Sequence, residues 1–342
     1  MPRRGSCPAP ARARRRRTPA PGRSGAARPR GLRDWWPRGG AAKMDGSARE
    51  ERTWSRTPRS VSAPRACAAM ADLVARITGL WRYPVKACAG EAVDALKLDA
   101  DGWPEDDRGW AIADAAGELT WMGAHPRLAL VKARLTPERL ELQAGGRGLA
   151  LPPDAGQPVE LRAWNGERQD FDQFDGWDAG DDAAALLRAT TGERLRLVRL
   201  SAEARRRPGL NALHLVGDGS LQAWQQALAQ PLAGLAQRAR PNLLLGAEAG
   251  GELPAFIEDI LVEMRVGSLR LRRTTPCVRC VVPTVDPASG KTQPPALEAL
   301  ARLSAERAPG APVQFGVYLN GSGAGWLGVG DRVELSLDFG NL

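Results

Sequence analysis

Two cysteines with an arginine between them are the residues of this sequence whose types and spacing best suit chemistry. Cys277 and Cys280 stand three positions apart with Arg279 between them. An apolar run follows and ends in an Asp-Pro-x-x-Gly turn at residues 286–290. Residues 266–273 alternate between apolar and polar side chains, which predicts a strand. We therefore expect the thiols to lie where this strand leaves its sheet.

A Cys-x-x-Cys pair is compatible with several kinds of site. A structural zinc site or a cubane iron–sulfur cluster needs about four ligands, and the other cysteines and histidines of the sequence form no second pair. These are Cys7, Cys67, Cys88, His125 and His214. A thioredoxin-type dithiol should open a helix, but the Val-Val-Pro-Thr-Val run at 281–285 consists of poor helix formers. Two interpretations stay open. One thiolate ligates a cofactor-borne metal while the arginine holds an anion, or both cysteines pack as small apolar side chains.

The elements that position these residues are expected after residue 69, because charge and composition divide the chain there. The formal net charge is +9. Residues 1–69 hold 18 Lys and Arg against 4 Asp and Glu, a net charge of +14. Residues 70–342 hold 30 against 35, a net charge of −5. The body of the protein is therefore mildly acidic, and we expect no nucleic acid to bind its folded part.

Residues 1–69 contain nine prolines, a run of four arginines and no apolar periodicity, which predicts disorder. They resemble a nucleic-acid-binding arm or an Arg-rich transit peptide. We favour a third interpretation, an over-extended start with true initiation at Met70 or Met44. The sequence has no charged-then-apolar signal and no run of about 18 apolar residues. We therefore expect no transmembrane segment and a bacterial cytoplasmic location, with organelle targeting as the minor alternative.

Short strands punctuated by turns dominate the rest of the chain, whose length allows two cores. Close spacing with little intervening helix predicts a small barrel or sandwich in the first part. The strands predicted there are 73–83, 92–98, 110–113, 118–122, 128–135, 140–143 and 159–164. Those predicted in the second part are 242–245, 261–266, 269–271, 315–319 and 333–337.

Helices are predicted mainly in the second part of the chain. Two acids precede a helix at 183–190, and a glycine follows it. Ser220 is expected to cap a helix with apolar residues to Leu235 that Pro231 kinks or splits. A short helix is expected at 296–303. The sequence thus predicts a mainly β fold with some α (α+β) in two domains, 70–180 and 181–342.

Several motifs, in a fixed order, resemble those of a known family. The run Pro-Cys-x-Arg-Cys-x-x-x-Thr-Val-Asp-Pro-x-x-Gly at 276–290 resembles the signature of the MOSC domain, named from molybdenum cofactor sulfurases. The similarity is to the two-domain class with bacterial YcbX-type proteins and the mitochondrial amidoxime-reducing component. Four further segments resemble motifs of that class, and the matches cover about residues 72–337. They are Tyr-Pro-Val-Lys at 83–86 with Gly90, Asp-Arg-Gly-Trp at 107–110, Arg-Pro-Asn at 240–242, and Phe315-Gly316 with 329–331.

This resemblance implies an N-terminal β-barrel domain, a MOSC β-barrel domain and a molybdenum cofactor (Mo-molybdopterin). It implies that Cys280 is the metal ligand and the catalytic residue, and that Arg240, Asn242 and Arg279 bind the cofactor. Lys86 and Arg108 are expected to reach the cofactor from the first domain, across a cleft. Cys277, Cys88, His125 and His214 are expected to be packing or structural residues. Two positions depart from the family pattern, Ala87 and Ala239, where relatives carry a serine and often an aromatic residue.

The same resemblance implies a reaction. It is the reduction of N-hydroxylated compounds from N–OH to N–H, a detoxification, with electrons from a separate flavin or iron–sulfur protein. No four-cysteine ferredoxin pattern occurs in the sequence, and pyridoxal phosphate is not expected. Two alternatives stay open. One is a sulfur-carrying or cofactor-handling MOSC protein, and the other is a non-enzymatic barrel that binds nucleic acid through the basic segment.

Overall fold

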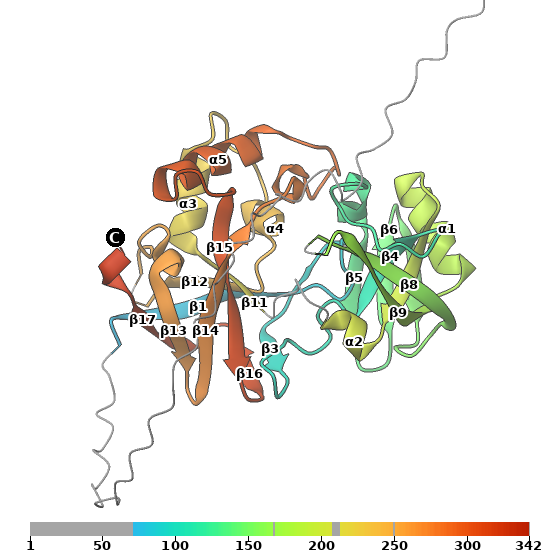
Figure 1. The fold of residues 1–342 in the computed structure, drawn as a ribbon, viewed down its shortest axis with the longest axis horizontal. Coiled ribbons are helices and arrows are strands. Elements are labelled where there is room, and N and C mark those ends of the chain that lie inside the picture. The colour runs from blue at the N-terminus through green and yellow to red at the C-terminus, as the bar shows by residue number, and fades with distance from the viewer. Residues whose placement is uncertain (1–70, 167, 207–212, 249, 342) are drawn as a thin grey trace, which may run out of the picture.

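The computed structural model describes residues 71–166, 168–206, 213–248 and 250–341 (Figure 1). The predictions for residues 1–69, including their disorder, lie outside the described residues. Strands dominate the described part, as predicted, and five α-helices accompany them. The predicted mainly β class with some α is therefore confirmed.

A closed barrel of seven strands forms the larger half of the described structure, on the left of Figure 1. Its strands are β1 (Leu73–Arg82), β11 (Leu213–Gly217), β12 (Leu243–Ala247), β13 (Leu261–Val266), β14 (Leu269–Val278), β15 (Gln314–Ser322) and β17 (Arg332–Leu337). They follow the order β12-β11-β15-β14-β13-β17-β1, and β1 pairs again with β12 to close the circle. Alternate residues of β1 point inward, and leucine, valine and isoleucine side chains fill the barrel.

A second group of strands forms the other half, on the right of Figure 1. A four-stranded sheet has the order β4-β10-β9-β8, and a three-stranded sheet has the order β5-β6-β7. Their bounds are β4 (Trp110–Asp114), β5 (Lys132–Leu135), β6 (Leu140–Ala144), β7 (Arg147–Leu151), β8 (Gln157–Asn165), β9 (Asp170–Asp178) and β10 (Leu195–Leu200). Two small elements link this half to the barrel. Strand β2 (Glu91–Ala92) pairs with β1, and β3 (Ala95–Leu98) pairs with β16 (Gly325–Gly328).

We predicted a domain boundary between residues 180 and 181, but elements from each side of it belong to the opposite half of the structure. Strand β1, the first element described, is a barrel strand between β12 and β17. Helix α1 (Asp181–Thr191) and strand β10 follow residue 180, yet α1 packs in the apolar core beside β4, and β10 pairs with β4 and β9. The chain therefore enters the barrel, leaves it for the second half, and returns.

Helix α1 forms where its sequence predicts, whereas the other helices depart from their predicted bounds. Helix α1 has Asp181 and Asp182 in its first turn, and Gly192 ends it in the left-handed conformation that glycine adopts at low cost. The helix predicted from Ser220 to Leu235 is split, as Pro231 requires, into α3 (Asp218–Gln226) and α4 (Leu235–Ala239). The predicted cap was wrong, because α3 begins two residues earlier and Ser220 is buried, where it donates to Glu258 Oε2 at 2.9 Å. Helices α2 (Ala202–Arg205) and α5 (Pro295–Arg307) complete the set.

The strand predictions are correct where one face is buried and weaker elsewhere. Residues 261–266 form β13 as predicted. The strand predicted at 128–135 was wrong in its first half, because Pro126–Leu130 form a 3-10 turn before β5. Residues 118–122 make only isolated bridges at their start. Strands β7, β9, β10 and β11 were not predicted. In the described part of the chain, no helix has the length and apolar character that crossing a lipid bilayer requires.

Candidate functional site

The cysteine pair lies at the end of strand β14, as predicted. The pairing of β14 with β15 shifts register on both sides of Pro276. Proline has no N–H to donate to a neighbouring strand and therefore belongs at such irregularities. Cys277 is 2% exposed, whereas Cys280, two residues beyond the strand, is exposed. A short 3-10 turn, Val282–Thr284, follows instead of an α-helix, which agrees with the poor helix formers in that run.

A cavity of about 250 Å³ opens above the exposed thiol and is lined from both halves of the structure. It brings together five of the six predicted site residues, namely Lys86, Arg108, Arg240, Arg279 and Cys280. The other lining residues are Ala87, Trp121, Met122, His214, Ala239, Cys277, Val278, Val282 and Tyr318. Lys86 and Arg108 come from the segments before β4, and the remaining cations come from the barrel half. None of these lining residues, all within the described part of the chain, is acidic.

The guanidinium of Arg240 lies against Tyr83 at one side of this cavity. Its Cζ is 4.2 Å from the centre of the Tyr83 ring, and its Nη1 donates to the carbonyl oxygen of Cys88 at 2.7 Å. Tyr83 is buried, and its hydroxyl donates to Pro241 O at 3.0 Å. Burial raises the pKa of Tyr83 to about 12, although Arg240 and Arg108 act in the opposite direction. The ring is thus a neutral platform for the cation.

Arg108 reaches the same ring from the opposite half. Its Cζ is 5.2 Å from the centre of the Tyr83 ring, and its Nη1 is paired with Asp107 Oδ2. Asp107 is buried, and its Oδ1 accepts the backbone N–H of Tyr83 at 2.6 Å. Burial alone would lower the pKa of Arg108, but Asp107 and the two tyrosines outweigh it and raise the pKa. Asp107 is thus paired with Arg108, and the cavity lining itself holds four cations and no carboxylate, so the site attracts anions.

Three lining residues share an uncommon backbone conformation. Ala87, Arg108 and Arg240 have φ values of 75°, 55° and 58°. Residues other than glycine adopt this left-handed region at a cost of about 1–3 kcal/mol, and such residues gather at functional sites. The conformation turns both arginines toward Tyr83, and it marks the site independently of the cations.

Arg279 is held from below by the cysteine and by the end of α4. Its Nη1 donates to Cys277 Sγ at 3.0 Å, and its Nη2 donates to Ala239 O at 2.8 Å. Its Nε is buried and has no hydrogen-bond partner among the described residues. A buried N–H without a partner is costly unless a ligand satisfies it. This nitrogen is therefore a donor available to an anion.

Cys277 is a buried residue of the cavity lining and belongs to a polar network. Its Sγ is 3.1 Å from Tyr318 Oη, and His214 also bonds to it. The Nδ1 and Nε2 atoms of the His214 ring lie 3.1 Å from Arg240 O and 3.3 Å from Phe315 O. Burial would raise the pKa of Cys277, but His214 and Arg279 outweigh it and lower the pKa to about 5. Burial, together with Cys277, raises the pKa of Tyr318, so its hydroxyl stays protonated and donates to the thiolate.

Sequence reasoning missed the role of His214 and Tyr318 in this network. It treated His214 as structural and did not consider Tyr318. One signal was available, because the chain has only two tyrosines. Both Tyr83 and Tyr318 lie at this site, each in contact with an arginine or a cysteine.

Asn242, the sixth predicted cofactor-binding residue, does not line the cavity. It is fully buried, its Nδ2 donates to Trp81 O at 3.1 Å, and its Oδ1 accepts the backbone N–H of His214 at 3.2 Å. It therefore ties β1 and β11 to the start of β12. His125 and Cys88 also lie outside the lining, and burial raises the pKa of Cys88 to about 12.

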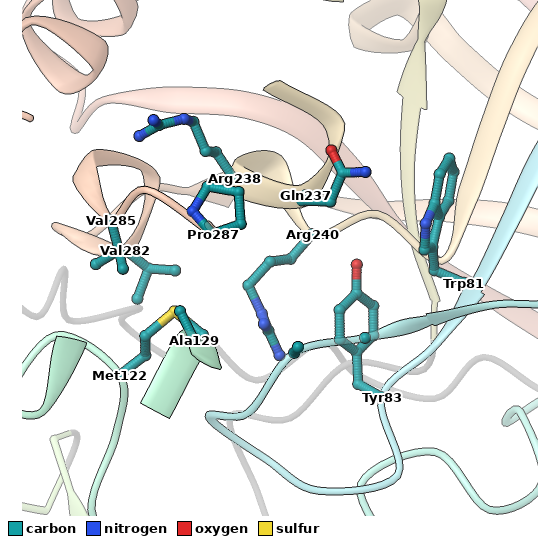
Figure 2. Close-up of a pocket in the computed structure, with 12 residues that line it drawn as sticks. Trp81, Tyr83, Met122, Ala129, Gln237, Arg238, Arg240, Val282, Val285 and Pro287 are labelled. Atoms are coloured by element: carbon teal, nitrogen blue, oxygen red, sulfur yellow. The ribbon is translucent and has the colours of Figure 1, made fainter. Parts of the chain in front are cut away.

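A second, smaller pocket adjoins the cavity and shares Met122, Arg240 and Val282 with it. Figure 2 shows Arg240 beside Tyr83 in this pocket, with Met122 and Val282 across from them. Arg238 is different, because its guanidinium points away from Tyr83 and donates to the carbonyl oxygens of Pro283 and Thr284 at 3.3 Å. Arg238 therefore stabilises the turn after Cys280, whereas Arg240 faces the space between the cavity and the smaller pocket.

Comparison with known proteins agrees with this architecture. Residues 74–194 match the MOSC N-terminal beta barrel domain, and residues 208–334 match the MOSC domain. The chain is a MOSC-domain protein. The first match contains most of β1, which belongs to the barrel of the second match, and β10 lies between the two matches.

Relatives of this MOSC-domain protein are similar at low identity. It is 26% identical over 301 residues to mitochondrial amidoxime reducing component 2 of Rattus norvegicus, which covers 78% of this chain and 84% of that protein. It is 25% identical over 264 residues to molybdenum cofactor sulfurase of Drosophila mojavensis, which covers 72% of this chain. The chain spans about a third of the length of the sulfurases that it matches. A solved structure, the YUAD protein from Bacillus subtilis, is 12% identical with a TM-score of 0.41, and the match covers 78% of this chain and 97% of that one.

Proposed function

We propose that this MOSC-domain protein binds a molybdenum cofactor and reduces N-hydroxylated compounds with electrons from a separate reductase. The observation that carries the proposal is the meeting of one exposed thiol, Cys280, with Lys86, Arg108, Arg240 and Arg279 around one cavity. The relatives named as amidoxime-reducing components and as a cofactor sulfurase support it.

The residues of the cavity fit such a cofactor. Molybdopterin carries a phosphate and a dithiolene that leaves metal positions for one soft protein ligand. Cys280 offers one thiol at the cavity surface, and its pKa is raised by desolvation, which outweighs the attraction of Arg279. The unpartnered Nε of Arg279 and the four cations of the cavity lining suit a phosphate. Cys280 would therefore ligate the metal, and Arg240 and Arg279 would hold the phosphate, with Lys86 and Arg108 beside them.

The overall reaction removes oxygen. The substrate N–OH, two electrons and two protons give N–H and water, and the bound cofactor supplies the two-electron redox chemistry. The chain supplies binding and orientation. Arg279 is fixed by Cys277 and Ala239, so its guanidinium is preorganised for an anion. Tyr318 stays protonated and keeps a hydroxyl at the cavity wall.

The test compares the two cysteines in the full chain, produced in a host that makes molybdopterin. The unmodified protein should contain near-stoichiometric molybdenum and reduce an amidoxime when a reductase is added. Cys280→Ser should lose the metal and at least about 100-fold of the activity. Cys277→Ser is the matched control and should keep the metal, because Cys277 is 2% exposed and a serine there can still accept the hydrogen bond from Arg279. Equal metal content and activity in Cys280→Ser would contradict the proposal.

A second function is favoured by one observation, the exposure of Cys280 in a chain related to cofactor sulfurases. An exposed thiol can carry sulfur as a persulfide. Cyanide-labile sulfur on Cys280, in cofactor-loaded protein that turns over no N-hydroxylated substrate, would favour this carrier function over the reductase.

A further inference from the structure

An apolar groove lies beside the cavity. Its volume is about 690 Å³, within the range of small-molecule pockets. It has three walls, from residues 121–124, residues 281–294 and one side of α5. The lining residues are Trp121, Gly123, Ala124, Val281, Thr284, Thr292, Pro294, Leu297, Glu298, Ala301 and Val313.

The groove adjoins the cavity that holds Cys280. Trp121 lines both spaces, so one indole forms their shared wall. Val281 directly follows Cys280 and lines the groove, whereas the next residue, Val282, lines the cavity. A molecule in the groove therefore contacts the residue next to the exposed thiol and the indole that also lines the cavity.

The walls are preformed. A Cβ atom on Gly123 would lie 2.5 Å from the Trp121 ring and 2.8 Å from Val281 Cγ2, so the indole and the valine pack over a position that only glycine fits. The opposite wall is α5, which is anchored where Trp224 Nε1 donates to Ala296 O at 2.9 Å. Ala299 and Leu300 of α5 are fully buried in the same apolar cluster. Rigid apolar walls lower the entropy cost of binding a flat molecule.

We propose that this groove binds the uncharged aromatic body of the substrate and that it makes the protein selective for aryl over small N-hydroxylated compounds. This inference rests on the proposed function, because the groove adjoins the cavity in which that function places the N–OH group. The indole of Trp121 offers a face on which an aromatic ring stacks. Val281, Leu297 and Ala301 offer apolar contacts, whereas the polar residues of the lining are Thr284, Thr292 and Glu298.

The first experiment narrows the groove and compares two substrates. Ala301→Phe adds a ring from the α5 wall, and Ala305→Phe is its matched control, since Ala305 is exposed one turn further along α5 and does not line the groove. Cofactor-loaded full chain is assayed with benzamidoxime and with acetamidoxime. Ala301→Phe should raise KM for benzamidoxime about tenfold and leave acetamidoxime within about twofold. Ala305→Phe should change neither, and equal effects on both substrates would overturn the inference.

A binding measurement separates this inference from the proposed function. Calorimetric titration of the full chain with benzamidoxime, in the absence of a reductase, should show binding that Ala301→Phe weakens and Ala305→Phe does not. Binding without reduction of any N-hydroxylated substrate would contradict the reductase function but would support the groove as a binding site. Reduction of both substrates, with no effect of Ala301→Phe on KM or on the calorimetric titration, would overturn the inference about the groove.

A second variant covers a failure of Ala301→Phe to fold. Trp121→Ala removes the indole that lines both spaces and adds no atoms to the groove. It should raise KM for benzamidoxime about tenfold more than KM for acetamidoxime. If Trp121→Ala or Ala301→Phe instead raised KM for the electron-donor protein alone, the groove would be a protein-docking surface and the proposal would be wrong.

Discussion

The Nη1 atom of Arg279 lies 3.0 Å from the buried Sγ of Cys277. The first cysteine of the pair thus holds the arginine of the motif, while Cys280 is left exposed in the cavity. Within four consecutive positions, Cys277 therefore fixes the cation of Arg279 and Cys280 presents a thiol. Four predictions follow from this arrangement and its surroundings.

Cys277 should contribute more to stability at neutral than at acidic pH. Its pKa is about 5 in the folded protein, below the usual value near 8.5 in an unfolded chain. A depressed pKa stabilises the fold fully above the unfolded value, and this stabilisation is lost as pH falls toward about 5. The free energy of unfolding of the cofactor-free protein should exceed that of Cys277→Ala by more at pH 8 than at pH 5. Denaturant titrations at both pH values measure this, and parallel pH profiles would contradict it.

Gly316→Ala should disturb His214 and the barrel. A Cβ there would lie 2.5 Å from His214 Nε2 and 2.6 Å from Leu215 O, and the residue has a φ of 75°. We expect a loss of about 2–4 kcal/mol of unfolding free energy. The control is Gly267→Ala, where φ is 57° but no atom lies within 4 Å, and we expect about 1 kcal/mol. Urea unfolding compares the two, and equal losses would mean that the contact with His214 costs nothing.

Tyr83→Phe should cost stability but leave the stacking of Arg240. The change removes the buried hydrogen bond to Pro241 O, which is worth about 1–2 kcal/mol when the acceptor is left unpaired. The ring that faces Arg240 remains. Metal content should therefore stay within about twofold of the unmodified protein while the midpoint of unfolding falls. A loss of metal without a loss of stability would show that the hydroxyl itself binds the cofactor.

Lys86→Gln should weaken the binding of a simple anion. Inorganic phosphate should raise the unfolding temperature of cofactor-free protein at constant ionic strength, because the cavity holds more cations than carboxylates. The rise should shrink in Lys86→Gln. It should persist in Lys97→Gln, a matched change at an exposed lysine paired with Glu105 at 3.0 Å. The same rise in all three proteins would mean that phosphate binds elsewhere.

Local chemistry explains what could be predicted of the fold. The strand at 261–266 and helix α1 follow from alternation and from acids and glycine at the helix ends. The turn at 286–290 forms as predicted, with Gly290 N–H donating to Asp286 O at 2.8 Å. Strand β9 was missed because four of its nine residues are aspartates, and its pairing with β8 overrides this unfavourable composition.

The sequence by itself determined the order of the motifs, the mainly β class and the candidate residues Cys280, Arg279, Arg240, Arg108 and Lys86. These depend on residue type and on spacing along the chain, which are local properties. Only the tertiary structure decided that β1 belongs to the closed barrel. It also decided that Trp121, which was predicted to lie in a strand, lines both the cavity and the groove. It also placed His214 and Tyr318 beside Cys277 and took Asn242 out of the lining. Those outcomes depend on burial and on pairing between residues far apart in sequence, because each buried polar atom takes whichever partner the closed barrel brings near.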